Sequence, residues 1–232
     1  MNPFVRRRWK RLARARHEQS SGFPSLADVL AAPLPDPRLL VSMAPLLAVD
    51  LEMTGLDSER HSIVSIGWVP IDNGAIDLGG CSEVGLVPND GDAVGQSATI
   101  HGIRDCDRLD GVGLQQALER LVGSLNGRVA VFHHAPLDTA FLERAMRSAL
   151  GVGWAWPSID TLAWFRRRQT GSDPETGGQP AHLDAAREHY GLPPRTAHNA
   201  LDDAISCAEV ALILAAKSRA RLGEVCDLPR IR

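Results

Sequence analysis

The stretch LLAVDLEMTGLDSERHSIVSIGWVPI, residues 46–71, contains two short apolar runs, and the first carries two acidic side chains, Asp50 and Glu52. The runs Leu46–Leu51 and Ile63–Ile71 predict two β-strands. Alternate residues of a strand share a face, so the two acids lie on one side, about 7 Å apart. Carboxylates in an apolar setting repel each other and are costly to bury without a partner. This pair predicts a site for a divalent cation such as Mg²⁺ or Mn²⁺; the alternative is an exposed strand end with two solvated acids.

The sequence beyond these strands alternates between strand and helix. Strands first in a meander, then alternating with helices, predict an α/β fold with a mixed central sheet flanked by helices. The expected elements are strands over Cys81–Val87 and Val129–Phe132 and helices over 113–125, 138–150, 182–190 and 200–217.

Composition narrows the class of protein. The 232 residues are 44% hydrophobic and 23% charged, which suits one domain with an appendage. No apolar run approaches the roughly 18 residues that cross a bilayer, so no membrane partner is expected. The four cysteines form no C-x-x-C pair, which argues against a zinc site or a disulfide framework and favours the cytoplasm. The N-terminus lacks the apolar segment of a secretory signal, although a mitochondrial-type presequence is an alternative.

Charge is distributed unevenly along the chain. Residues 1–16 hold seven of the 25 basic residues and no acid, so the remainder has 18 basic against 28 acidic residues, a formal charge of −10. Such an arm can contact a polyanion, or it can be the solvated face of a helix docked on the body by Phe4, Val5, Trp9 and Leu12. The expected organisation is a basic arm with a Pro-rich linker over 1–43, a compact domain over 44–217, and a C-terminal tail over 218–232.

Two later segments each add an acid near a buried element. AVFHHAPLDTAFLERAM, residues 130–146, places Asp138 just after a strand, where an acid can also serve only as a helix cap or first-turn dipole partner. RTAHNALDDAISCAEVALIL, residues 195–214, places His198 in a loop and Asp203 at the edge of an apolar helix stripe. Asp202 is interpreted as a first-turn acid outside the site, and Asp160 as a helix cap.

These three segments, in this order, resemble the three motifs of the DnaQ-like 3′–5′ exonucleases, over roughly residues 44–217. His198, five residues before Asp203, is typical of the DEDDh subgroup, and TIHGI at 99–103 is similar to the family's His-Gly segment. The first motif, DLEMTGLD, is closely similar to that of the oligoribonucleases. His134 replaces the asparagine usual in the second motif.

The resemblance implies a ribonuclease H-like exonuclease fold and two Mg²⁺ or Mn²⁺ ions held by Asp50, Glu52, Asp138 and Asp203. Such ions activate a water and stabilise the leaving O3′, and His198 would take the proton from the water. The products would be nucleoside 5′-monophosphates released from a free 3′ end, with single strands the expected substrate. Thr54, Gly55 and Leu56 would meet the terminal nucleotide through backbone amides and apolar contact. Further candidates for the pocket wall are His101, His133 and Phe141. The two histidines could equally be partly buried structural residues, and Phe141 could equally be a core residue.

Three alternatives compete with a DNA or RNA exonuclease of this kind. An oligoribonuclease-like enzyme for short RNAs fits the first motif. A haloacid-dehalogenase-type phosphohydrolase has a similar acidic motif but calls for a lysine near the phosphate, and the chain has only Lys10 and Lys217. A non-catalytic nucleic-acid-binding module would be expected to have lost some of the motif residues. The sequence does not determine the oligomeric state or whether the substrate is DNA or RNA.

Overall fold

The computed structural model describes residues 3–20, 26–88, 109–169, 182–195 and 199–229. Within these ranges one mixed sheet of seven strands runs in the order β3-β2-β1-β5-β6-β7, and β4 pairs with β2. Strand β1 is antiparallel to β2 and parallel to β5, which confirms the predicted mixed sheet. The strands are β1 Leu46–Met53, β2 Ile63–Asp72, β3 Ala75–Ile76, β4 Ser82–Gly85, β5 Val129–Phe132, β6 Ser158–Asp160 and β7 Cys226–Asp227.

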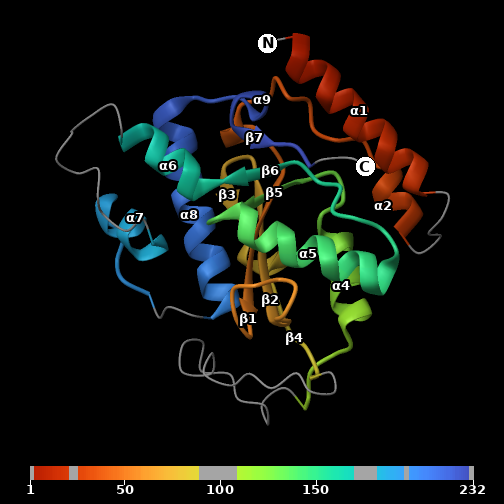
Figure 1. The fold of residues 1–232 in the computed structure, drawn as a ribbon. Helices are drawn as coiled ribbons and strands as arrows, with labels where there is room; N and C mark the ends of the chain where they lie inside the picture. Colours follow the sequence, from red (N-terminus) through yellow and green to blue (C-terminus); the bar gives the residue numbers. More distant parts are fainter. Residues whose placement is uncertain (1–2, 21–25, 89–108, 170–181, 196–198, 230–232) are drawn as a thin grey trace.

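Helices cover both faces of this sheet (Figure 1). They are α1 Pro3–Ser20, α2 Ala27–Ala31, α4 Leu114–Ser124, α5 Ala135–Leu150, α6 Thr161–Gln169, α7 Leu183–His189, α8 Ala200–Ser218 and α9 Leu222–Val225, with short 3₁₀ turns at Val41–Met43 and Leu78–Gly80. Figure 1 shows α8 on one side of β1 and β2 and α4 and α5 on the other.

The alternation of β1 divides the core into two clusters. Leu47, Val49 and Leu51 belong to the cluster that includes residues of α4 and α5, whereas Leu46 and Ala48 pack in the cluster formed with α8. By the same alternation, even-numbered positions of β1 face α8. The two acids of β1 therefore lie on the side of the sheet that α8 covers.

Most of the predicted elements are present, with shifted ends. Strand β5 has the predicted bounds, β1 and β2 are longer than predicted, and β4 is shorter. Helix α5 begins at Ala135 rather than near residue 138, with Pro136 in its first turn, where a proline's missing N–H costs little. Strands β3, β6 and β7, each of two or three residues, were not predicted, because runs this short carry no periodicity.

The N-terminal segment packs against the rest of the molecule. Trp9 and Leu12 of α1 are buried, as expected for a docked helix, but Phe4 is 64% exposed and does not belong to the buried stripe. Leu26 and Leu30, from the segment expected to be a linker, belong to the core cluster that includes β1 and β2. The core therefore draws residues from both sides of the boundary expected at residue 44. No described helix is both long and apolar enough to span a membrane.

Candidate active site

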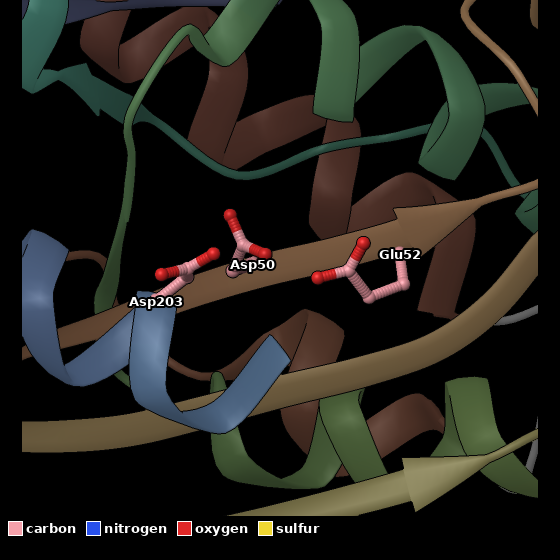
Figure 2. A group of neighbouring side chains, drawn as sticks. All are labelled: Asp50, Glu52 and Asp203. Carbon is pink, nitrogen blue, oxygen red and sulfur yellow. The ribbon is translucent and has the colours of Figure 1, made fainter. Parts of the chain in front are cut away.

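Three of the predicted acids come together at the sheet. Asp50 and Glu52 project from one face of β1, and Asp203 reaches them from the first turn of α8 (Figure 2). One carboxylate oxygen from each lies within 4.8 Å of the other two. Glu52 is only 8% exposed. The strand alternation and the helix position read from the sequence therefore converge on one cluster.

A glycine on the neighbouring strand lets α8 approach this closely. Gly67 of β2 is paired with Asp50 of β1. A Cβ placed on Gly67 would lie 2.2 Å from the carbonyl carbon of Ala200 and 2.3 Å from the amide nitrogen of Leu201. The first turn of α8 thus rests directly on the backbone of β2, which carries Asp203 to the cluster. We did not identify Gly67 from the sequence, although a glycine inside a strand is a recognised signal of close backbone approach.

The start of α8 is also fixed by its cap. The side chain of Asn199 accepts a hydrogen bond from the amide of Asp202 (3.0 Å), and its amide group donates to both carboxylate oxygens of Glu83 (3.2 Å each). Glu83 lies on β4 opposite Gly67, so β4 anchors the helix terminus. Glu83 is a second residue that the sequence reasoning missed. Asp202, 3.9 Å from Arg195, lies outside the metal-ligand cluster, as expected.

Asp160, the last residue of β6, holds the turn between β5 and α5, and this turn positions Asp138. One carboxylate oxygen of Asp160 accepts hydrogen bonds from the amides of Ala163 (3.1 Å) and His134 (3.2 Å). The first bond caps α6, as predicted for Asp160. The second holds His134, whose φ of 89° is in the left-handed region, at the start of α5. This turn sets Asp138 in the first turn of α5, buried and close enough to Asp50 to raise the pKa of that carboxyl group.

The electrostatics of the acids follow from burial and mutual repulsion. Burial and then the charges of Asp138, Asp203 and Glu52 raise the pKa of Asp50 well above its usual value. Burial, and then Asp203 and Glu83, raise the pKa of Glu52 to about 7. The pKa of Asp138 is also raised, chiefly by burial. A cation among these carboxylates would offset both causes, so the donor set fits a hard divalent ion.

The loop after β1 carries three of the predicted substrate contacts. The amide of Thr54 donates to the carbonyl of Ser62 (3.0 Å), and the Thr54 hydroxyl accepts from the Ser62 amide (3.0 Å). The Thr54 amide therefore closes the loop, and contact of Thr54 with the terminal nucleotide stays a prediction. A Cβ on Gly55 would lie 2.6 Å from the ring of His61, so the ring packs on the glycine backbone. Leu56 is 76% exposed and accessible to an apolar ligand.

The other predicted substrate contacts lie in different settings. His133 is half-buried, and its Nδ1 lies 2.8 Å from the hydroxyl of Thr161. Phe141 belongs to the core and lines a cavity of about 140 Å³ together with His61 and Arg144. These contacts account for both rings structurally, and their contact with substrate stays a prediction. His101 and His198 lie outside the described residues.

Comparison with known proteins places this geometry in a family. Residues 47–211 match the RNase_T family model, described as exonuclease. The DNA polymerase III PolC-type proteins of Thermotoga petrophila and Thermotoga maritima are each 31% identical over 170 residues. The match covers 73% of this chain and 12% of either relative, so the chain spans about an eighth of their length.

Solved structures show the same fold at low sequence identity. Escherichia coli exonuclease I in complex with a dA16 oligonucleotide has a TM-score of 0.69 at 14% identity, covering 78% of this chain and 42% of that one. The nuclease domain of 3′hExo, a DEDDh family member bound to rAMP, has a TM-score of 0.65 at 14% identity, covering 82% and 98%. Exonuclease X in complex with 5′ overhanging duplex DNA has a TM-score of 0.58 at 22% identity, covering 75% and 92%. These likenesses confirm the predicted ribonuclease H-like fold. Since the family model matches most of the chain, the protein belongs to the RNase_T exonuclease family, in agreement with the predicted relationship to the DnaQ-like exonucleases.

Proposed function

We propose that the protein is a metal-dependent 3′–5′ exonuclease that releases nucleoside 5′-monophosphates from nucleic acid with a free 3′ end. The observation that carries the proposal is the convergence of Asp50, Glu52 and Asp203, with ligand atoms within 4.8 Å of one another, in a chain of the exonuclease family. Buried carboxylates at this spacing destabilise the protein unless a cation offsets their repulsion. An arrangement that is costly to the fold is therefore expected to serve a bound metal.

The acids of the site would hold two Mg²⁺ or Mn²⁺ ions, with Asp50, Glu52, Asp138 and Asp203 as the ligands. When bound, the ions would polarise a water and stabilise the leaving oxygen of the phosphodiester. The protein keeps the ligands in place by different means: β1 aligns Asp50 and Glu52, and the α8 terminus presents Asp203. The role of this scaffold is to hold several like charges at one point before substrate arrives.

His198 is proposed as the general base, which makes the protein a DEDDh exonuclease. It immediately precedes Asn199, and the Asn199 side chain is bonded to Glu83 at the rim of the cluster. His198 is five residues before Asp203 in the sequence, which supports a role at this cluster. An imidazole titrates near neutrality, so it can accept the proton of the attacking water at working pH.

The substrate class is proposed from the family and from the first motif. The similar structures named above were solved with single-stranded DNA, overhanging duplex DNA and rAMP, which supports nucleic acid with an accessible end as the ligand. The exposed side chain of Leu56, four residues after Glu52 in the sequence, suits apolar contact with a terminal base. The DLEMTGLD motif favours a second candidate, an oligoribonuclease-like enzyme for short RNA.

A panel of 3′-labelled substrates tests the proposal. The purified protein would be incubated with single-stranded DNA, duplex DNA, long RNA and RNA dinucleotides, each with Mg²⁺, with Mn²⁺ and with EDTA. We expect mononucleotide release that needs a divalent metal and prefers single strands. Preference for dinucleotides over long strands would favour the oligoribonuclease-like alternative. Release that is undiminished in EDTA would refute the proposal.

A further inference from the structure

Helix α1 is docked on the body in a fixed orientation. Trp9, Leu12 and Arg16, which follow the helical repeat, are buried, and Arg16 is only 1% exposed. The guanidinium of Arg16 donates to the carbonyls of Val29 (2.7 Å) and Ala155 (3.3 Å) and lies 4.7 Å from the ring of Trp156. One cation of the basic segment thus has a structural role. The opposite side of the helix is turned to solvent.

The solvent side of α1 carries a cationic ridge, defined here as Arg7, Lys10, Arg11 and Arg14, all of them exposed. The residues are three, four and seven positions apart, so they are neighbours on successive turns. Like charges at these spacings oppose helix formation. Glu18 pairs with Arg14 at 2.7 Å, with both side chains mostly exposed. The ridge lies opposite the buried Trp9, Leu12 and Arg16, so it does not pack α1 on the body. A role in binding an anion accounts for the ridge better than a role in docking α1.

A groove runs along α5, whose first turn carries Asp138, to the C-terminal segment that lies beside α1. Its volume is about 1170 Å³, and it follows the outer side of α5 from Pro136 to Ser148. Its lining includes Ala135 and Pro136 in the first turn of α5, Ser58 in the loop after β1, and residues 227–229 of the C-terminal segment. The Arg8 guanidinium of α1 donates to the carbonyl of Leu228 (3.4 Å), so this part of the groove adjoins α1. Figure 1 shows α5 leading toward the side of the molecule that carries α1 and α2.

We infer that a single nucleic-acid strand lies in this groove and that its phosphates reach the cationic ridge of α1. The inference rests on the proposed function for placing the 3′ end at the acidic cluster. The body has a formal charge of −10, so a polyanion needs local cations away from the metals. The groove itself is lined by charges of both signs, including the Glu143–Arg147 pair (2.5 Å), so the ridge is the main source of attraction.

The length of α5 along the groove determines how long a substrate must be to contact the ridge. From Pro136 to Ser148 the helix rises about 18 Å, which a stacked strand spans with about five nucleotides. Shorter substrates end before they reach α1. An anionic membrane is the less favoured partner, because the apolar side of α1, with Trp9 and Leu12, is buried and not available for insertion.

Binding measured without hydrolysis tests the inference. The full chain in EDTA would be titrated with fluorescent oligo-dT of about 15 and about 3 nucleotides over a range of salt, since each phosphate contact contributes about −0.7 to the slope of log affinity against log salt. The variant Arg7→Gln/Lys10→Gln/Arg11→Gln removes three ridge charges with residues of similar helix propensity. The control Arg120→Gln/Lys217→Gln/Arg219→Gln removes three exposed charges elsewhere.

The ridge variant is expected to flatten the slope for the long strand by up to about 2 units, to leave the short strand unchanged, and to keep its melting temperature. Arg7→Lys/Arg11→Lys keeps both charges and should keep the parental slope. Arg7→Gln and Arg11→Gln, made singly, should each flatten the slope for the long strand by about 0.7. The inference would be overturned if the parent and the ridge variant had equal slopes, or if the control variant flattened the slope as much as the ridge variant. It would also be overturned if the ridge bound anionic phosphatidylserine vesicles more strongly than the long strand. Absence of nuclease activity with Mg²⁺ would overturn the proposed function alone, because this binding is measured without catalysis.

Discussion

The raised pKa of Glu52 makes the metal-free protein sensitive to pH in a way that one substitution removes. Burial and the nearby acids raise this pKa from 4.5 to about 7, whereas the unfolded chain returns it to its ordinary value. Between these values the folded protein binds more protons than the unfolded one, so the free energy of unfolding falls as pH rises. The rise of the Glu52 pKa from 4.5 to about 7 corresponds to a loss of about 3 kcal/mol in the free energy of unfolding by pH 8. Glu52→Gln is neutral in both states and lacks this loss.

Urea unfolding in EDTA at pH 4.5, 6 and 8 measures this effect. The parent and Glu52→Gln are expected to be similar at pH 4.5, and the variant is expected to be more stable by up to about 3 kcal/mol at pH 8. Glu188→Gln, on the exposed side of α7, is the control and should follow the parent. Saturating Mn²⁺ should stabilise the parent more than Glu52→Gln, because the variant lacks a ligand. Parallel pH profiles for the parent and Glu52→Gln would refute the account of repelling buried acids.

Three further substitutions separate catalysis from scaffold. Asp203→Ala should lower turnover at least about 10²-fold without lowering the melting temperature, because removing one acid relieves repulsion. The control Asp202→Ala should retain activity. A collapsed fold for Asp203→Ala would mean that this acid has a structural role. His198→Ala should lower turnover by roughly 10²–10⁴-fold, abolish the acid limb of the pH–rate profile and leave metal affinity measured by calorimetry intact; a loss of affinity would make His198 a ligand. Gly67→Ala should cost about 1–3 kcal/mol in urea unfolding and weaken metal binding, because its Cβ would meet the backbone of α8; parental stability would contradict this packing.

The sequence was sufficient to predict the parts of the fold that have strong periodicity. Strands β1, β2 and β5 and helices α4 and α8 are long or strongly apolar, and their residues follow the expected spacing. Strands β3, β6 and β7 hold only two or three residues each, and their pairing depends on neighbours distant in the chain. Tertiary contacts, which a local pattern does not contain, determine these short strands.

The site shows the same division between local and tertiary information. Asp50 and Glu52 could be predicted from strand alternation, and Asp203 from its position on an apolar helix. The supporting contacts of Gly67 and Glu83 could not, because each depends on the register of β2 with β1 or β4 and on the close approach of α8. The bond from the Thr54 amide to Ser62 was also not predictable, because it depends on the shape of the loop after β1, which the sequence does not show.

Product analysis on one substrate tests the central claim most directly. A single-stranded oligonucleotide labelled at its 5′ end, and a second one labelled at its 3′ end, would be incubated with the protein and Mg²⁺ or Mn²⁺, with EDTA and Asp203→Ala as controls. The account predicts a ladder of 5′-labelled strands that shortens one nucleotide at a time, early release of labelled nucleoside 5′-monophosphate from the 3′ end, and neither product in the controls. Internal cleavage, release that begins at the 5′ end, or equal activity in Asp203→Ala would contradict it.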